Sequence, residues 1–119
     1  DNMDSALAYL KKTVGDDKVE VTCLHGMNPS RISRTDCAGY DKVASAVAST
    51  WKGCVVTPYL MVQCSDSRHW GRISDKVYRF SAMDLTSEER ATIHGNNEKI
   101  RLETLHRSVE FFMRLIKNC

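Results

Sequence analysis

Three loop sites carry side chains that could bind a ligand or take part in a reaction. The first is Ser65-Asp66-Ser67-Arg68-His69, which follows an apolar segment with strand-like composition. In open α/β sheets, ligands bind beyond the carboxyl ends of strands, and an arginine there can donate two hydrogen bonds to a carboxylate. The alternative is that Asp66 or a serine caps a helix while Arg68 lies on the surface. Taken alone, the residues favour this alternative.

The other two sites lie four residues apart in a polar loop. His94 is a candidate metal ligand, and Gly95 allows the backbone to approach closely. A single loop histidine is more often an ordinary surface residue. Glu98 can orient a group in the site, but it can equally cap the final helix or pair with Arg101. The residues alone leave these alternatives open.

Helical periodicity predicts the elements that position these loops. Apolar spacing indicates helices over residues 3–14 and from Asp36, as the cap, to about Thr50. Thr86 and Glu89 match a capping box and predict a helical turn. The clearest prediction is a closing helix with one apolar stripe, which we expect to be buried. That stripe comprises Leu102, Leu105, Val109, Phe112, Met113 and Ile116.

Three segments have the alternation or the β-branched composition of strands, namely residues 18–24, 55–62 and 77–80. Pro58 indicates that the second is an edge strand or is bent. Residues 26–35 lack periodicity and are typical of a linker or hinge. After this segment helices and strands alternate, which predicts an α/β layer with the second and third strands as neighbours and the closing helix packed on them.

Composition excludes several classes of protein. The chain has 119 residues, 42% of them hydrophobic, which suits one globular domain. Its net charge is only +2, so we expect no nucleic-acid or membrane partner. No apolar run is long enough to span a bilayer. No signal peptide is visible, although one can precede the first residue given.

The cysteines point to free thiols. There are five, an odd number, at wide spacings and with no Cys-x-x-Cys pair, so a structural zinc site is not expected. Such usage is typical of a reducing compartment, and we therefore expect the cytoplasm. The five are Cys23, Cys37, Cys54, Cys64 and Cys119.

The motifs also occur in a particular order along the chain. Pro58-Tyr59-Leu60 is followed by the Asp66-Ser67-Arg68 run, by Val77-Tyr78-Arg79-Phe80 and by Ile93-His94-Gly95-Asn96-Asn97-Glu98-Lys99-Ile100. This order resembles the C-terminal end of the M-twenty metallopeptidases, which include aminoacylases, carboxypeptidase S-like enzymes and dipeptidases. The resemblance covers about residues 30–119. The helix and strand before it resemble the end of the lid domain of such enzymes.

The resemblance implies a fold and a division into domains. The fold is α/β, with an α+β lid remnant followed by the C-terminal part of a zinc-peptidase-like α/β catalytic domain. Residues 1–26 would end the lid or dimerisation domain, residues 27–35 would form the hinge, and residues 36–119 would belong to the catalytic domain.

The resemblance also implies roles for individual residues. His94 matches the last metal ligand of the family, and Arg68 matches the arginine that binds the substrate carboxylate in relatives. Asp66 matches the aspartate before that arginine, which would orient it or the loop. Three further positions match the loop and helix start that hold the histidine, namely Gly95, Asn97 and Glu98.

Other parts of the family pattern have no counterpart here. The upstream His-x-Asp pair, the bridging aspartate and the general-base glutamate are missing, and one imidazole cannot hold two metal ions. The resemblance therefore implies a parent enzyme that uses two zinc ions to hydrolyse N-acyl amino acids or short peptides. We expect this chain alone to hold little or no zinc and to be inactive. The alternative is a non-catalytic structural or dimerisation module, and a homodimer is one form it can take.

Overall fold

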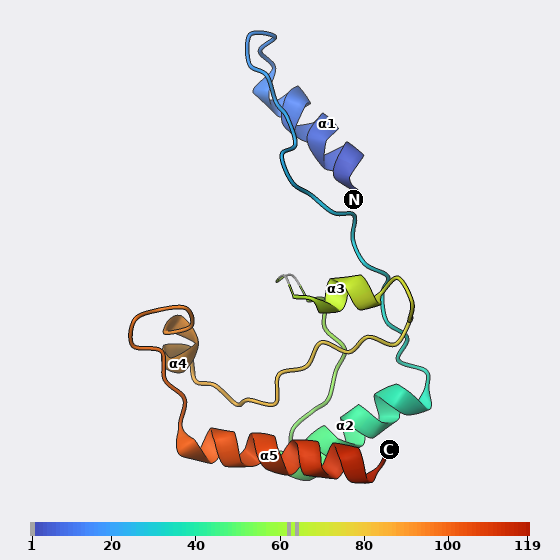
Figure 1. The fold of residues 1–119 in the computed structure, drawn as a ribbon, viewed down its shortest axis with the longest axis vertical. Helices are drawn as coiled ribbons and strands as arrows, with labels where there is room; N and C mark the ends of the chain where they lie inside the picture. The colour runs from blue at the N-terminus through green and yellow to red at the C-terminus, as the bar shows by residue number, and fades with distance from the viewer. Residues whose placement is uncertain (1, 62, 64) are drawn as a thin grey trace.

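The computed structural model describes residues 2–61, 63 and 65–119. Within that part of the chain the secondary structure is helical and no strand is present. Figure 1 shows the first helix standing apart at one end of the molecule, with the second and the last at the other. The elements are α1 (Met3–Val14), α2 (Ala38–Thr50), α3 (Ser67–Trp70), α4 (Ser87–Ala91) and α5 (Leu102–Lys117).

Local signals account for where α1 begins and ends. The Asn2 side chain accepts a hydrogen bond of 2.8 Å from the backbone N–H of Ser5, and the Ser5 hydroxyl completes a capping box. Gly15 ends the helix in the left-handed conformation, with φ of 59°. The helix predicted over residues 3–14 is confirmed. No residue of α1 is fully buried, so its apolar stripe is only partly covered by the described residues.

The cap of α2 differs from the prediction. Cys37, and not Asp36, is the N-cap residue, and its side chain makes no capping hydrogen bond. Asp36 is drawn away by Arg34, whose Nε lies 3.0 Å from Asp36 Oδ1. The Asp36 carboxylate thus forms an ion pair with Arg34 and does not cap α2 as predicted.

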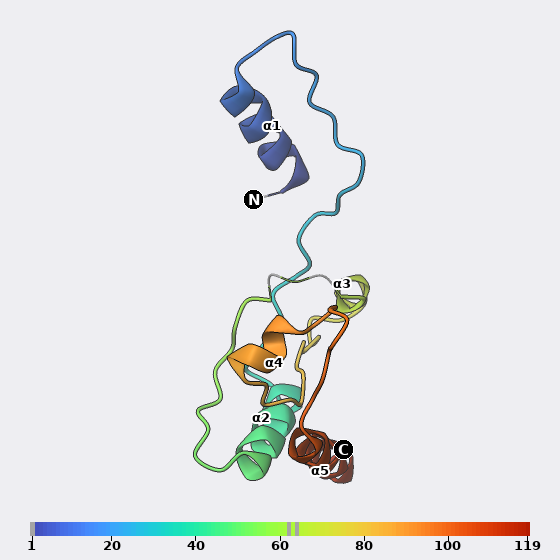
Figure 2. The same cartoon turned by 90° about the vertical axis from the view of Figure 1, so that its left-hand side faces the viewer.

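The core lies where α2 packs against α5, the one helix pair in contact among the described elements (Figure 2). Its buried apolar residues are few, and Phe111 of α5 is at their centre. The Phe111 ring centroid lies 5.0 Å from that of Phe80 and 5.8 Å from that of Trp51. The four buried apolar residues are Ala46, Val47, Ala82 and Phe111.

The orientation of α5 corrects one prediction. The helix forms as expected, but its predicted stripe is exposed, with Leu102 at 65% and Ile116 at 71%. Thr104 and Phe111 are buried instead. The cause is a polar anchor, because Thr104 Oγ1 donates to Asp84 at 2.9 Å and so fixes which face turns inward. The narrow face packs on α2, and within the described residues nothing covers the broad apolar face.

The expectation of strands also needs correction. Residues 18–24, 55–61 and 77–80 are irregular, and Val62, the end of the second predicted strand, lies outside the described residues. A strand needs a neighbouring backbone to complete its hydrogen bonds. Here a side chain takes that place, because Ser33 Oγ both accepts from the backbone N–H of Val77 and donates to its carbonyl. The predicted α/β layer is therefore not present in the part of the chain that the structure describes.

Residues 2–28 form a small unit of their own around α1. The backbone N–H of Met3 donates to Asn28 Oδ1 at 2.9 Å, so the chain that leaves α1 returns to its start. No helix in the described part of the chain has both the length and the apolar character needed to cross a bilayer.

Candidate functional site

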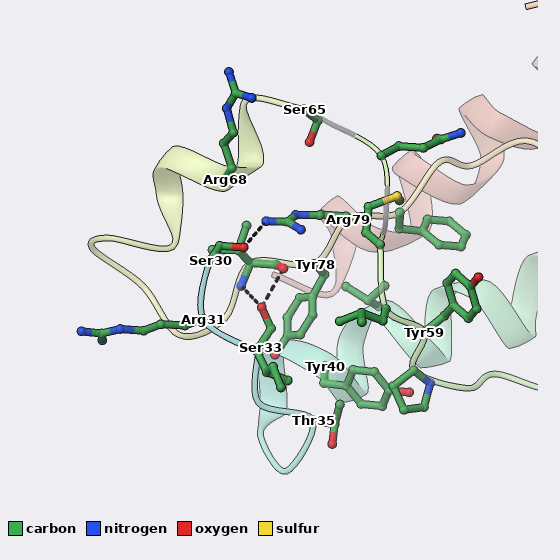
Figure 3. Close-up of a pocket in the computed structure, with 18 of the residues that line it drawn as sticks. Ser30, Arg31, Ser33, Thr35, Tyr40, Tyr59, Ser65, Arg68, Tyr78 and Arg79 are labelled. Carbon is green, nitrogen blue, oxygen red and sulfur yellow. Dashed lines mark hydrogen bonds between the residues drawn. The ribbon is translucent and has the colours of Figure 1, made fainter. Parts of the chain in front are cut away.

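A cavity of about 1090 Å³ lies on the side of α2 that faces residues 77–80. Residues 25–33 and 54–61 form its other walls, so four separate stretches of sequence meet there. Figure 3 shows Tyr40 of α2 and Tyr78 on this wall. Residues 55–61 and 77–80, both from predicted strands, therefore face each other across a cavity and do not pair.

Hydrogen bonds between distant segments hold one wall together. The backbone N–H of Arg34 donates to the carbonyl of Asp75 at 2.9 Å, and the Tyr78 hydroxyl donates to the carbonyl of Arg34 at 2.9 Å. Together with the two bonds of Ser33, these contacts dock residues 30–37 against residues 75–79. Most of the predicted hinge is thus part of the cavity wall.

Cys37 and Tyr78 form a polar pair at the edge of this wall that the sequence did not reveal. Their Sγ and Oη atoms lie 2.9 Å apart. This contact, with backbone N–H groups at the start of α2, lowers the pKa of the Cys37 thiol. Burial and the same contact raise the pKa of Tyr78 to about 12. The partners are 41 residues apart, so no local pattern could have indicated the contact.

Arg68 lies at the rim of the cavity. It sits on the short helix α3, is exposed, and points away from the cavity interior in Figure 3. Its Nε lies 3.3 Å from His69 Nε2, and no carboxylate pairs with it among the described residues. Asp66 precedes α3 without a side-chain capping bond and is also exposed. The roles assigned to Arg68 and Asp66 stay predictions.

The His94 loop lies outside the cavity, between α4 and α5. His94 has a φ of 65°, the left-handed conformation that few residues other than glycine adopt. Two hydrogen bonds hold the turn: Gly95 N–H donates to the Thr92 carbonyl at 2.8 Å, and His94 N–H donates to Glu98 Oε2 at 3.2 Å. Asn97 is exposed in the same loop.

The alternatives for Glu98 are now resolved. It does not cap α5, whose N-cap residue is Arg101. It does not pair with Arg101 either, because the Arg101 Nε lies 3.0 Å from Glu89 Oε1. Glu89 is also the N3 residue of the predicted capping box, which is confirmed by the bond from Thr86 N–H to Glu89 Oε2 at 2.8 Å.

The donor set in this chain does not fit a two-zinc centre. No group of three or more His, Cys, Asp or Glu side chains gathers to hold a metal ion among residues 2–61, 63 and 65–119. The Glu98 oxygen nearest the loop already accepts the His94 N–H. His94 thus stands without companion ligands from the described residues.

Arg79 is the cavity residue whose importance the sequence did not show. In the sequence Arg79 is one residue of the motif over residues 77–80, and no local pattern separates it from an ordinary strand residue. Its Nη2 donates to Ser30 Oγ at 2.6 Å, and its Nε is buried without a hydrogen-bond partner among the described residues. Figure 3 shows the Arg79 side chain pointing toward Ser30, across the wall from Tyr78.

Comparison with known proteins finds relatives that are named as acyl-amino acid synthase/hydrolases and as carboxypeptidases. It is 32% identical over 117 residues, or 98% of its length, to the N-fatty-acyl-amino acid synthase/hydrolase of Xenopus tropicalis. It is 24% identical over 99% of its length to the Dictyostelium discoideum protein named "Probable carboxypeptidase S-like 2". An uncharacterized carboxypeptidase of Schizosaccharomyces pombe is 32% identical over 76% of the chain.

These relatives are much longer proteins. The aligned region is 23% of the Xenopus protein, 23% of the Dictyostelium protein and 16% of the yeast protein. The chain therefore spans about a quarter or less of the curated relatives it matches. No family model matches the chain, and no solved structure matches it.

Proposed function

Because the chain belongs to the M-twenty metallopeptidase family, we propose that it is the C-terminal segment of a zinc-dependent amidohydrolase or peptidase. The observation that carries this proposal is similarity over 98% of the chain to a fatty-acyl-amino acid synthase/hydrolase, with the Arg68 and His94 motifs in family order. The substrate class is an N-acyl amino acid or a short peptide. Its side-chain preference would be read by parts of the whole protein that this chain does not include.

Arg68 is the proposed anchor for the substrate carboxylate. It is exposed at the rim of the cavity, and no described carboxylate neutralises it. Its guanidinium can therefore turn toward a ligand and form the two-bond fork that orients a carboxylate for reaction. Asp66 is proposed to orient this loop from the residue two positions before.

His94 is the proposed metal ligand of the whole enzyme. Its ring makes no hydrogen bond among the described residues, while the backbone on both sides is held by Thr92 and Glu98. That arrangement leaves an imidazole available on a fixed turn, with Gly95, Asn97 and Glu98 as supporting residues. The remaining ligands and the general base would come from outside this chain.

The proposed division into domains follows the same resemblance. Residues 1–26 would end the lid, residues 27–35 would form the hinge, and residues 36–119 would complete an α/β catalytic domain. The odd number and wide spacing of the five cysteines support the proposal of a reducing compartment such as the cytoplasm. Cys64 lies outside the described residues.

The test is hydrolysis by a full-length protein that contains this segment. We expect it to hydrolyse an N-acyl amino acid and to lose activity with a chelator. Its activity should fall by about 100-fold or more in the His94→Ala variant, because loss of even a residue that supports a metal ligand costs about 10–100-fold. His106→Ala is the matched control, because this exposed helix histidine has no assigned role. We expect the 119-residue chain alone to show no hydrolysis. Full activity in the His94→Ala protein would refute the metal-ligand role.

Arg68 has a test of its own in the same full-length protein. Arg68→Ala should raise the KM for carboxylate-bearing substrates far more than for their amides, because only the acid loses a charge-assisted bond. Equal losses on both substrates would exclude the carboxylate role.

A second candidate function is a non-catalytic structural or dimerisation module. The exposed apolar face of α5 favours it, because large apolar patches mark interaction surfaces. A dimerisation module of this kind forms a homodimer, and the substitutions Val109→Glu and Met113→Glu should each dissociate it. Sedimentation equilibrium measures the mass directly, and a monomer at all concentrations would exclude the homodimer.

A further inference from the structure

The cavity has an unusual balance of charge. Its described lining includes no aspartate or glutamate but three arginines, namely Arg31, Arg68 and Arg79. Most other lining residues are apolar, contributed by α2 and by residues 54–61. A space of this kind suits a ligand with an apolar body and an anionic end.

Arg79 differs from the other partly buried arginines. Arg107 has its Nη1 atom 2.8 Å from Asp84 Oδ2, and Arg114 forms an ion pair with Glu110. Arg79 has no carboxylate within 4.0 Å among the described residues, and its hydrogen bond goes to the neutral hydroxyl of Ser30. Its Nε is thus withdrawn from water, and no described carboxylate lies beside the guanidinium.

That arrangement leaves Arg79 with unused hydrogen-bonding capacity that an anion can fill. Partly buried charges are normally paired, and a guanidinium offers five N–H donors. Of these, one nitrogen of Arg79 bonds to Ser30 and another is buried without an acceptor. Ser30 thereby fixes the side chain against the wall of the cavity, which is how a binding residue is held ready for its ligand.

We propose that Arg79 is a second carboxylate-binding residue, seated inside the cavity, to which neither the family resemblance nor the proposed site assigns a role. The ligand is an organic carboxylate with an apolar body, and it enters with its anionic end toward Arg79. Arg31 and Arg68 lie exposed near the mouth and attract the anion at longer range. The choice of carboxylate over other anions rests on the proposed function.

Binding to the 119-residue chain tests this inference without any need for catalysis. The probes are N-acetyl-phenylalanine, its primary amide and inorganic phosphate, titrated by calorimetry and by the NMR signal of the Arg79 side-chain N–H. We expect the acid to bind about ten-fold more tightly than the amide, as charge-assisted bonds require. Its binding should shift the Arg79 signal, and phosphate should bind less tightly than the acid.

Variants separate a binding role from a structural one. Arg79→Met should bring the affinity for the acid down by about ten-fold, to that of the amide, while circular dichroism stays unchanged. Arg79→Lys keeps the charge and should recover part of the preference for the acid. Ser30→Ala removes the hydrogen bond that holds Arg79, and Arg31→Ala removes an exposed charge near the mouth. Each should weaken binding of the acid by less than about three-fold.

Several outcomes would overturn the proposal. Equal affinity for acid and amide in the native chain, or no binding of either, would exclude a carboxylate site. Tighter Arg79-dependent binding of phosphate would assign the cavity to another anion. Unchanged acid binding in Arg79→Met with a loss in Arg68→Ala would return the role to Arg68 alone, and the proposed function would survive that result.

Discussion

The cavity wall and the His94 loop are built in opposite ways. The wall depends on bonds between distant residues: Ser30 to Arg79 spans 49 positions and Ser33 to Val77 spans 44. The loop depends on near neighbours, because His94 bonds to a residue four positions away. A motif held by local contacts keeps its geometry with little help, whereas the cavity exists only while α2, α5 and the two docked segments stay together.

The largest expected effect comes from Phe111→Ala. Phe111 is the largest residue of a small core, and such truncations cost about 3–5 kcal/mol. We expect the variant to lose its cooperative denaturant transition together with the cavity. Amide signals of residues 92–95 should change least, because local bonds hold them. Phe112→Ala, at an exposed position on the same helix, is the control and should cost under about 1 kcal/mol.

If the His94 loop lost its structure together with the cavity in Phe111→Ala, the proposed difference between the two regions would be wrong. It would show that the His94 turn also depends on the core. The route would be Arg101, which joins the start of α5 to Glu89 of α4.

The next largest effect should come from acid pH. It should weaken the contacts by which Asp84 and Glu89 hold α5. The bond from Thr86 N–H and the nearby Arg101 outweigh desolvation and hold the pKa of Glu89 below its ordinary 4.5. Burial opposes ionisation of Asp84, but the bond from Thr104 and the charges of Arg107 and Arg101 lower its pKa below 3.8. A carboxylate with a depressed pKa stabilises the fold above its unfolded pKa and loses that contribution as pH falls through the folded value.

We therefore expect stability to be steady above about pH 5 and to fall as the pH drops below about 4. Denaturant melts of the native chain and of an Asp84→Asn, Glu89→Gln double variant measure this. The variant should be less stable at neutral pH and show a shallower acid loss. Identical acid profiles would mean that other carboxylates govern the transition.

Tyr78→Phe should produce a smaller effect, confined to the cavity wall. The Cys37 thiolate loses the hydrogen bond that the Tyr78 hydroxyl can donate to it, so the pKa of Cys37 should rise toward the ordinary value of 9.0. The rate of alkylation as a function of pH reports the change. Tyr40→Phe, which alters a neighbouring hydroxyl on α2, is the control, and equal shifts in both variants would count against a specific pair.

The smallest effect should be local to the His94 turn. A β-branched side chain is strained in the left-handed conformation, so His94→Val should cost about 1 kcal/mol. His94→Gly should change the free energy of unfolding little, because relief of strain offsets the added freedom of the unfolded chain. Equal free energies of unfolding for the valine and glycine variants would contradict this prediction, because they would show that the backbone at residue 94 can change conformation without strain.

The same contrast explains what the sequence could predict. Helices carry their signals within a few residues, so α1 and the capping box of α4 were found correctly. A strand needs a partner elsewhere, and residues 77–80 bond instead to the Ser33 side chain. Which face of α5 is buried depends on the bond to Asp84, which lies 20 positions before Thr104. Periodicity alone therefore predicted the wrong face as the buried one. Arg79 carried no local pattern that separated a binding residue from a strand residue.

Because the broad apolar face of α5 is exposed, the solubility of the chain should depend strongly on which salt is in solution. Six large apolar side chains remain in contact with water along one helix, including Val109 at 53% and Phe112 at 49%. Salts that are excluded from protein surfaces strengthen the tendency of such a face to leave water. Sulfate should therefore precipitate the chain at a lower ionic strength than chloride does. A fluorescent dye that binds apolar surfaces should also increase in fluorescence when it is added to the fully folded protein.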